Sequence, residues 1–248
     1  MTIVRCEEIR KYFKGKTGIV KAVDGVSLDI KKGDAFGLVG ESGCGKTTLG
    51  KLILGILKPD SGSITRSTEK MQVVFQDPFN SLDPKMKILD ILAEGLIINQ
   101  PRTGRGRLNS PELKKKIEEA LDLVRMPKES LRKYPHQFSG GERQRIAIGR
   151  AVLTDPELIV CDEPVSSLDV TIQLEILKLL KVIQRKLSVT YLFISHDLRV
   201  VRFLCNKLAV MRYGRIIESG ATENVYGDPA DAYTKALLSS AFYDTIKK

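Results

Sequence analysis

Gly40-Glu41-Ser42-Gly43-Cys44-Gly45-Lys46-Thr47 fits the pattern Gly-x4-Gly-Lys-Ser/Thr of a phosphate-binding loop. Glycines let successive backbone N–H groups point inward around a phosphate, and the helix that follows presents its positive N-terminus. Lys46 can reach the β- and γ-phosphates of a nucleotide, and the Thr47 hydroxyl can coordinate Mg²⁺. We therefore expect a nucleotide site formed by Gly40, Ser42, Gly43, Cys44, Gly45, Lys46, Thr47 and Thr48.

The residues on either side of the loop favour this interpretation over a chance glycine-rich turn. The apolar run 35–39 precedes the loop as a short strand, and Leu49, Leu52, Ile53 and Ile56 follow it at helical spacing. A strand before the loop and a helix after it are the context in which the motif binds phosphate.

A second apolar run, Leu158–Cys161, ends in two carboxylates. In an open α/β sheet, ligands bind at the carboxyl ends of the strands, which is where Asp162 and Glu163 would lie. We expect Asp162 to hold Mg²⁺ through water and Glu163 to polarise an attacking water as a general base. The alternative is a solvated surface turn, which the phosphate loop upstream makes less attractive.

Ser139-Gly140-Gly141-Glu142 stands before an apolar-periodic helix. Exposed N–H groups and a hydroxyl at a helix N-terminus form a second anion site. A plain N-cap, with Glu142 as the capping-box partner of Ser139, is the alternative and is compatible with that role.

Along the chain, strand signals alternate with helical patterns, which predicts a parallel, doubly wound α/β sheet. Asp24-Gly25 is a turn signal among the apolar residues of 20–30, and Tyr213-Gly214 predicts a hairpin. Helices are predicted at 171–186 and 232–238. Residues 81–151 form a helical insertion with faces at Ile88, Ile91, Leu92 and Leu96 and at Leu113, Ile117, Leu121 and Val124. A loop rich in Gly, Arg and Pro, 100–111, separates those two faces.

The composition excludes several classes of protein. The 248 residues are 42% hydrophobic and 28% charged, which is a globular composition. No apolar run reaches the roughly 18 residues of a membrane span, and the N-terminus is not that of a signal peptide, so we expect neither a membrane span nor export by that route. The four cysteines and two histidines lack zinc-site spacing, and we expect reduced thiols. The net charge of +10 suggests either an anionic partner or a lysine-rich surface.

Six motifs occur in the order found in the nucleotide-binding subunits of ATP-binding-cassette (ABC) transporters, and the chain resembles that family over nearly its whole length. They are the phosphate loop, Gln76 after a strand, the Ser139–Glu142 signature, Asp162-Glu163, Ser167-Leu168-Asp169 and Ser195-His196-Asp197. The resemblance implies a P-loop NTPase (RecA-like) core with an antiparallel β subdomain, residues 1–80 and 152–248. The inserted α-helical subdomain, 81–151, would carry the signature, and 1–248 would be a single nucleotide-binding domain.

The resemblance also implies roles for individual residues. ATP and Mg²⁺ would be bound, with Glu163, His196, Gln76 and Lys46 catalytic and Thr47, Gln76 and Asp162 at the metal. Ser139, Gly140, Gly141 and Glu142 would bind the γ-phosphate of the partner subunit's ATP, and Asp169 would bridge the two subunits. Tyr12 and Phe13 both lie about where the family stacks an aromatic ring on adenine. His136 has no such support and is left as structural.

Within the family, the closest resemblance is to oligopeptide and dipeptide importers, and to the second of their two ATPase subunits. It is carried by the phosphate loop, by Phe75–Pro84, by Tyr134–Ser139 and by a tail element, Gly227–Leu238, that keeps Pro229 and Tyr233-Thr234 but lacks a second proline and its histidine. Without the cysteine spacing of some relatives, no iron–sulfur cluster is expected.

The implied function is ATP hydrolysis that drives import of a peptide or another small solute. The implied partners are a different ABC ATPase subunit, two transmembrane permease subunits and an extracytoplasmic solute-binding protein, at the cytoplasmic face of the membrane. No nucleic acid is expected. The alternatives are a soluble ABC ATPase that acts on nucleic acid or ribosomes, suggested by the charge, and a P-loop small-molecule kinase, which does not explain the signature or His196. The sequence does not identify the solute or the role of 102–107.

Overall fold

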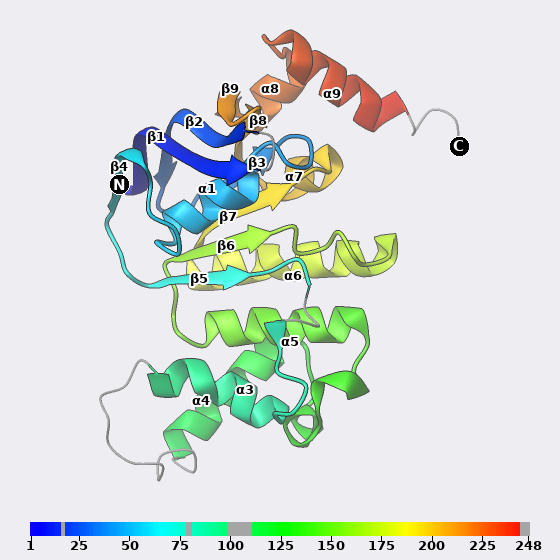
Figure 1. The fold of residues 1–248 in the computed structure, drawn as a ribbon. Helices are drawn as coiled ribbons and strands as arrows, with labels where there is room; N and C mark the ends of the chain where they lie inside the picture. The colour runs from blue at the N-terminus through cyan, green and yellow to red at the C-terminus, as the bar shows by residue number, and fades with distance from the viewer. Residues whose placement is uncertain (16–17, 78–80, 99–110, 244–248) are drawn as a thin grey trace.

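A six-stranded sheet runs through the upper part of the molecule as drawn in Figure 1, with strand order β5-β6-β7-β3-β8-β9. The computed structural model describes residues 1–15, 18–77, 81–98 and 111–243. All neighbouring strands of this sheet are parallel except β8 and β9, which pair antiparallel through the hairpin predicted at Tyr213-Gly214. The strands are β3 (Ala35–Val39), β5 (Met71–Val74), β6 (Leu158–Asp162), β7 (Thr190–Ser195), β8 (Lys207–Arg212) and β9 (Arg215–Ala221).

A smaller antiparallel sheet of order β2-β1-β4 lies beside the large one. It consists of β1 (Thr2–Gly15), β2 (Gly18–Lys31) and β4 (Ser61–Arg66). The turn predicted at Asp24-Gly25 is wrong, because β2 continues through these residues. Arg10 pairs with Asp24 and Ile9 with Val26, so Gly25 is the extra residue of a β-bulge. The carboxylate of Asp24 is held by Tyr12 and Arg215, and these bonds keep the segment in the sheet.

The residues of the central strands alternate between two hydrophobic cores. In β7, Leu192 and Ile194 join the core that contains helix α1 (Lys46–Ile53) and the antiparallel sheet. Tyr191 and Phe193 join the other core, which contains α6 (Val170–Leu187) and α7 (Leu198–Leu204). Strands buried on both faces explain the continuous apolar runs in the sequence.

A layer of helices occupies the lower part of Figure 1. It consists of α3 (Ile88–Ile98), α4 (Pro111–Leu123), α5 (Gly140–Val152) and the 3₁₀ turns η2 (Lys128–Arg132) and η3 (Pro135–Gln137). The helical faces predicted at 88–96 and 113–124 are confirmed, because Ile88, Ile91, Leu92, Ile117, Leu121 and Val124 are buried and Leu96 and Leu113 pack against them. These side chains belong to the same core as one face of the sheet. Most of the loop predicted at 100–111, with its basic residues 102–107, lies outside the described residues.

The tail contains α8 (Thr222–Gly227) and α9 (Ala232–Tyr243), and α9 is longer than the predicted helix 232–238. The predicted helix 171–186 is α6. All four cysteines are free and buried, as the sequence predicts. Within the described ranges, no helix has the length and apolar character needed to cross a bilayer.

Candidate functional site

Four predicted site segments leave the same edge of the large sheet. Val74 pairs with Cys161 and Asp162 pairs with Ile194, so Gln76, Glu163 and His196 follow the carboxyl ends of adjacent parallel strands. Val39 pairs with Ser195, so the phosphate loop and His196 begin side by side at this edge of the sheet. The strand order β5-β6-β7-β3 therefore gathers residues that lie far apart in the sequence.

The phosphate loop joins β3 to α1, and close packing requires glycine at position 45, directly before Lys46. Gly45, the N-cap of α1, has φ 111°, and a Cβ there would lie 1.9 Å from the carbonyl oxygen of Ala22 in β2. No side chain fits that space, because the antiparallel sheet lies directly against the loop. The first backbone N–H groups of an α-helix lack intrahelical partners, so those at the start of α1 can bind an anion held by the loop.

The ammonium of Lys46 is enclosed by the loop that precedes it. Its Nζ donates to the carbonyl oxygens of Gly40 at 2.7 Å and Glu41 at 2.8 Å, and the residue is only 5% exposed. Cys44 lies under the same ammonium, and burial raises the pKa of its thiol. The ammonium is therefore held in place by two carbonyl oxygens of the loop, which phosphate oxygens could replace.

Thr47 and Asp162 provide two oxygen ligands side by side. The Thr47 hydroxyl donates to Asp162 Oδ1 at 3.1 Å. Burial raises the pKa of the Asp162 carboxyl, and the hydrogen bond from Thr47 opposes that rise. Oxygen donors of this kind suit Mg²⁺, which keeps several other ligands as water or phosphate oxygens. Within the described residues, no group of three or more His, Cys, Asp or Glu side chains is arranged to hold a metal ion.

Glu163 and His196 face each other across the ends of β6 and β7. His196 Nδ1 lies 3.0 Å from Glu163 Oε2. The Glu163 N–H donates to the carbonyl oxygen of Ile194 at 2.9 Å, which fixes the backbone in the left-handed region at φ 49°. For a residue other than glycine, this backbone conformation costs on the order of 1 kcal/mol of folding free energy. Glu163 is largely buried and His196 is half exposed, so the pair is open to a ligand on one side.

Gln76 is exposed after the end of β5, and Thr48 follows Thr47 in the first turn of α1.

His136 lies in η3, within the helical layer, and its ring is stacked on Tyr134 with centroids 5.8 Å apart. Residues 78–80 of the segment Phe75–Pro84 lie outside the described residues.

The signature residues lie in the helical layer, away from the phosphate loop of the same chain (Figure 1). Ser139 caps α5, and Glu142 completes a capping box by accepting from the Ser139 N–H at 2.8 Å and from its hydroxyl at 2.9 Å. The N-cap and the predicted anion site would therefore use the same groups, the hydroxyl of Ser139 and the N–H groups at the start of α5. A Cβ on Gly141 would lie 2.6 Å from Ile172 Cγ2, so the signature packs closely against the start of α6.

Asp169 caps α6, because its Oδ1 accepts from the Ile172 N–H at 3.0 Å. A Cβ on Gly140 would lie 3.3 Å from Leu168 Cδ2, so Gly140 also packs against the segment before α6. The signature and the residues around Asp169 therefore form one continuous surface.

The two candidate adenine-stacking rings differ in their surroundings. The Tyr12 hydroxyl donates to Asp24 Oδ1 at 2.5 Å, and this bond is the main reason that the pKa of Tyr12 is raised. The Phe13 ring is 40% exposed, with the ammonium of Lys11 5.8 Å from its centroid. The tail adds one contact that the sequence reasoning did not assign: the Tyr233 hydroxyl accepts from the Glu41 N–H at 3.4 Å.

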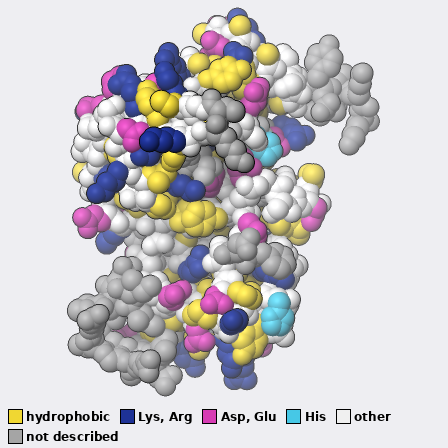
Figure 2. Space-filling view, in the orientation of Figure 1, with side chains coloured by type: hydrophobic (Ala, Val, Ile, Leu, Met, Phe, Trp, Pro, Cys, Tyr) yellow, Lys and Arg dark blue, Asp and Glu magenta, His cyan; other side chains and the backbone are white. Residues whose placement is uncertain are grey.

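Basic and acidic side chains are interspersed over the face shown in Figure 2. The excess positive charge of the chain is therefore not gathered into a single basic surface on this face. Many of the described basic residues are also paired, such as Arg215 with Asp24 and Arg145 with Glu175.

Comparisons with known proteins identify the family and relatives of the chain. The family described as "ABC transporter" matches residues 23–166. The chain is 40% identical over 255 aligned positions to the oligopeptide transport ATP-binding protein OppF of Bacillus subtilis, covering 96% of this chain and 82% of OppF. Among solved structures, CbiO1 of Clostridium perfringens, part of the CbiONQ ABC transporter complex, superposes with a TM-score of 0.79 at 26% identity over 100% of this chain and 99% of CbiO1. The ATP-binding cassette MJ0796, solved as a post-hydrolysis dimer with ADP and Pi, superposes with a TM-score of 0.76 at 25% identity over 88% of this chain and 98% of MJ0796.

Proposed function

The chain belongs to the ABC transporter family, and from that premise we propose that it is the ATP-hydrolysing subunit of an importer that carries peptides. The observation that carries the proposal is the set of side chains at one sheet edge: Lys46 in the phosphate loop, Thr47 bonded to Asp162, and Glu163 paired with His196. The relatives' names support peptide as the class of cargo.

ATP would be bound by residues 40–48 with its phosphates against the loop and the N-terminus of α1. Lys46 already lies among the loop carbonyls, so its ammonium needs only to exchange those partners for phosphate oxygens. Thr47 and Asp162, with Gln76 from the adjacent strand end, would hold Mg²⁺. The ion would neutralise charge on the β- and γ-phosphate oxygens.

Glu163 would act as the general base. Its carboxylate is held by His196 on one side, and its backbone is fixed by Ile194, so the acceptor for a water proton has a defined position. His196 can then donate to the γ-phosphate as charge moves onto its oxygens during in-line attack. Phe13 is the better candidate for stacking on adenine, since it is exposed whereas Tyr12 is partly buried and held by Asp24.

The signature would complete the site of another subunit. Ser139, Gly140, Gly141 and Glu142 form a helix N-terminus separated from the phosphate loop of their own chain, and Asp169 lies on the same surface. A head-to-tail pair of cassettes would bring each signature to the other's ATP, as the dimeric state of MJ0796 supports. We propose that residues 81–151 act as the signature-bearing subdomain of one nucleotide-binding domain.

The remaining partners follow from this role. We propose a different ABC ATPase as the second cassette and a solute-binding protein on the other side of the membrane. Two permease subunits would change conformation when ATP binding brings the two cassettes together. The chain would then work as a peripheral subunit at the cytoplasmic face.

The hydrolytic role is tested by Glu163→Gln, with Glu157→Gln as the matched control. Glu157 precedes the opposite end of β6, where it pairs with Lys32. We expect Glu163→Gln to bind ATP with the wild-type Kd but to lose at least about 100-fold in turnover, the contribution typical of a general base. Glu157→Gln should retain turnover. Wild-type turnover in Glu163→Gln would remove Glu163 as the base.

The transport role is tested by using Glu163→Gln as the bait in a pull-down from gently solubilised membranes with ATP and Mg²⁺. Recovery of two multi-span proteins and a second cassette is expected, and peptide uptake by that permease can then be measured. Recovery of ribosomes or DNA-bound proteins, with nothing from the membrane, would instead support the soluble ABC ATPase.

A further inference from the structure

The tail element Gly227–Leu238 is a motif that the roles above do not explain, and it contacts the phosphate loop. The Tyr233 hydroxyl accepts from the Glu41 N–H at 3.4 Å, and the carbonyl oxygen of the same Glu41 accepts from Lys46 Nζ at 2.8 Å. A tail side chain is thus joined to the phosphate-binding lysine through one residue of the loop.

The ring of Tyr233 also contacts the last residue of β8. The guanidinium of Arg212, the last residue of β8, lies 4.4 Å from the ring centroid. Its neighbour Met211 packs against the loop, because a Cβ on Gly40 would lie 2.1 Å from the Met211 carbonyl oxygen. The first turn of the phosphate loop therefore contacts both the end of β8 and Tyr233. Burial raises the pKa of the phenol, with the hydrogen bond from Glu41 opposing it, so the hydroxyl is neutral at physiological pH.

Helix α9 is anchored at its base, so the position of Tyr233 is fixed. Glu218 in β9 accepts from the backbone N–H groups of Ala230 at 2.8 Å and Asp231 at 3.1 Å. Asp231 in turn accepts from the Tyr233 N–H at 2.7 Å. These bonds tie the start of α9 to the large sheet.

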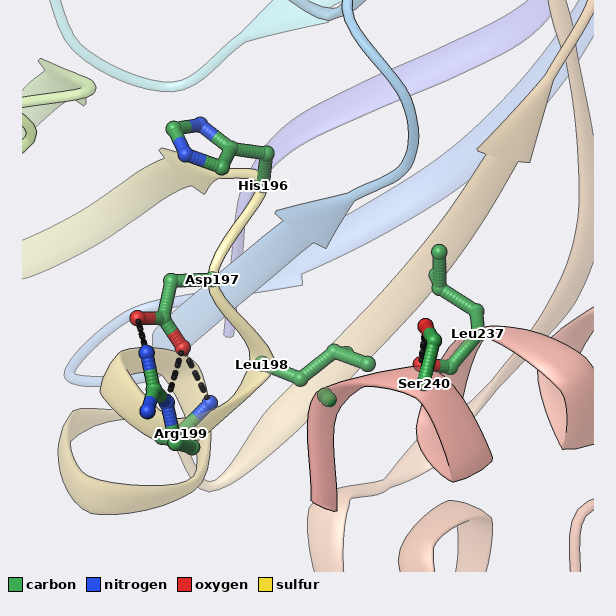
Figure 3. A pocket seen from close by; sticks show the side chains of 7 residues that line it. His196, Asp197, Leu198, Arg199, Leu237 and Ser240 are labelled. Carbon is green, nitrogen blue, oxygen red and sulfur yellow. Dashed lines mark hydrogen bonds and ion pairs between the residues drawn. The ribbon is translucent and has the colours of Figure 1, made fainter. Parts of the chain in front are cut away.

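The same helix borders the loop that carries His196. A pocket of about 350 Å³ lies between them, lined by His196, Asp197 and Arg199 on one side and by Leu237, Ser240 and Ala241 on the other. In Figure 3, Leu198 extends toward the helix that carries Leu237 and Ser240, while Arg199 is paired with Asp197. One helix therefore contacts both the phosphate loop and the segment after His196.

We propose that Tyr233 is a positioning residue for ATP binding. By accepting the Glu41 N–H, it fixes the orientation of the peptide before Glu41 and so the carbonyl that holds Lys46. A loop ordered in advance loses less conformational entropy when the phosphates bind. The inference rests on the proposed function, because it concerns the same ATP site.

The test is Tyr233→Phe, with Tyr213→Phe as the control. Tyr213 also lies over Arg212, with the guanidinium 5.0 Å from its centroid, but it is 76% exposed and its hydroxyl has no hydrogen-bond partner in the described part of the chain. The two changes remove the same atom, and Tyr233→Phe keeps the ring on Arg212. The Kd of a fluorescent ATP analogue, the KM and kcat for ATP and the thermal midpoint are measured on the full chain.

We expect Tyr233→Phe to raise Kd and KM about fivefold, the effect of losing one hydrogen bond, with kcat and the thermal midpoint near wild type. Tyr213→Phe should match wild type throughout. Unchanged Kd and KM in Tyr233→Phe would overturn the proposal, and so would an equal loss in Tyr213→Phe. Failure of the wild-type chain to bind the analogue would instead overturn the proposed ATP site itself.

Discussion

Two adjacent aromatic residues near the phosphate loop differ in what their side chains can still bind. The Tyr12 hydroxyl is bonded to Asp24, which Arg215 also holds, whereas the Phe13 ring is exposed. The sequence left both as candidates for adenine stacking. The distinction depends on the side-chain contacts of Tyr12 in the folded sheet, and so it could not be predicted from local spacing.

The first prediction concerns this pair. Phe13→Ala should raise the Kd for ATP about tenfold, because loss of base stacking on an aromatic ring typically costs 1–3 kcal/mol. Tyr12→Phe should leave that Kd unchanged and lower the thermal midpoint, since only the bond to Asp24 is lost. Equilibrium titration and thermal melting distinguish the two effects. A larger loss of affinity in Tyr12→Phe would reverse the assignment.

Most of the residues at the sheet edge could be identified from sequence because each belongs to a short contiguous motif. Lys46 lies within the phosphate loop, and Glu163 and His196 each follow an apolar strand directly. Their contacts could not be predicted. The bond between Glu163 and His196, and the capping of α6 by Asp169, depend on side-chain positions that only the packed sheet and helices determine.

At the scale of the elements, the antiparallel sheet is joined to β9 through one carboxylate. Asp24 in β2 accepts from Tyr12 in β1 and from Arg215 in β9, at 2.7 Å for Nη2. The bond from Tyr12 and then the bonds from Arg215 lower the pKa of Asp24, and they outweigh burial, which acts in the opposite direction. The sequence predicted a turn at this point because Asp-Gly is a turn signal whatever partners the aspartate finds in the fold.

The second prediction is a pH dependence of stability. Because the folded pKa of Asp24 lies below its ordinary value of 3.8, its contribution is present above that value and is lost as the pH falls through the folded pKa. Asp24→Asn should therefore lower the thermal midpoint at pH 7, and the difference from wild type should shrink below about pH 4. Melting curves from pH 7 to pH 3 measure this.

Asp29→Asn is the control for that series. Asp29 lies on the same strand and is bonded to Arg5, but both side chains are about half exposed, and exposed pairs contribute little to stability. It should show a small difference at every pH. A constant difference for Asp24→Asn across the range would contradict the role of its charge.

At the scale of the whole molecule, the helical layer is not a separate body. Ile88, Ile117 and Val152 share one core with Ile159 and Phe193 of the sheet. The sequence predicted this layer from its helical periodicity, and the sheet from its apolar runs. The side chains through which they join could not be assigned in advance, because periodicity shows which face of a helix is buried but not what covers it.

The third prediction concerns the composite ATP site. Ser139→Asp keeps a good N-cap for α5 but presents a negative charge where the γ-phosphate of a partner would bind. In the Glu163→Gln background it should bind ATP with unchanged affinity in its own phosphate loop and associate with the partner cassette at least about tenfold more weakly, since repulsion between like charges costs several kcal/mol at an interface. Sedimentation velocity with ATP and Mg²⁺ measures the association.

Lys46→Ala is the complementary variant, because it should lose ATP binding in its own loop. If Ser139→Asp lowered the affinity for ATP in the isolated chain, the signature would act within its own subunit. Undiminished association of Ser139→Asp would exclude the signature from the contact between cassettes.

Glu163 has a consequence for how this chain can change under selection. Its left-handed backbone at φ 49° would be relieved by glycine, at a gain on the order of 1 kcal/mol in folding free energy. The same replacement removes the carboxylate beside His196. If ATP hydrolysis were no longer under selection, stability alone would favour glycine at this position. The resulting chain would fold and bind nucleotide but would not hydrolyse it.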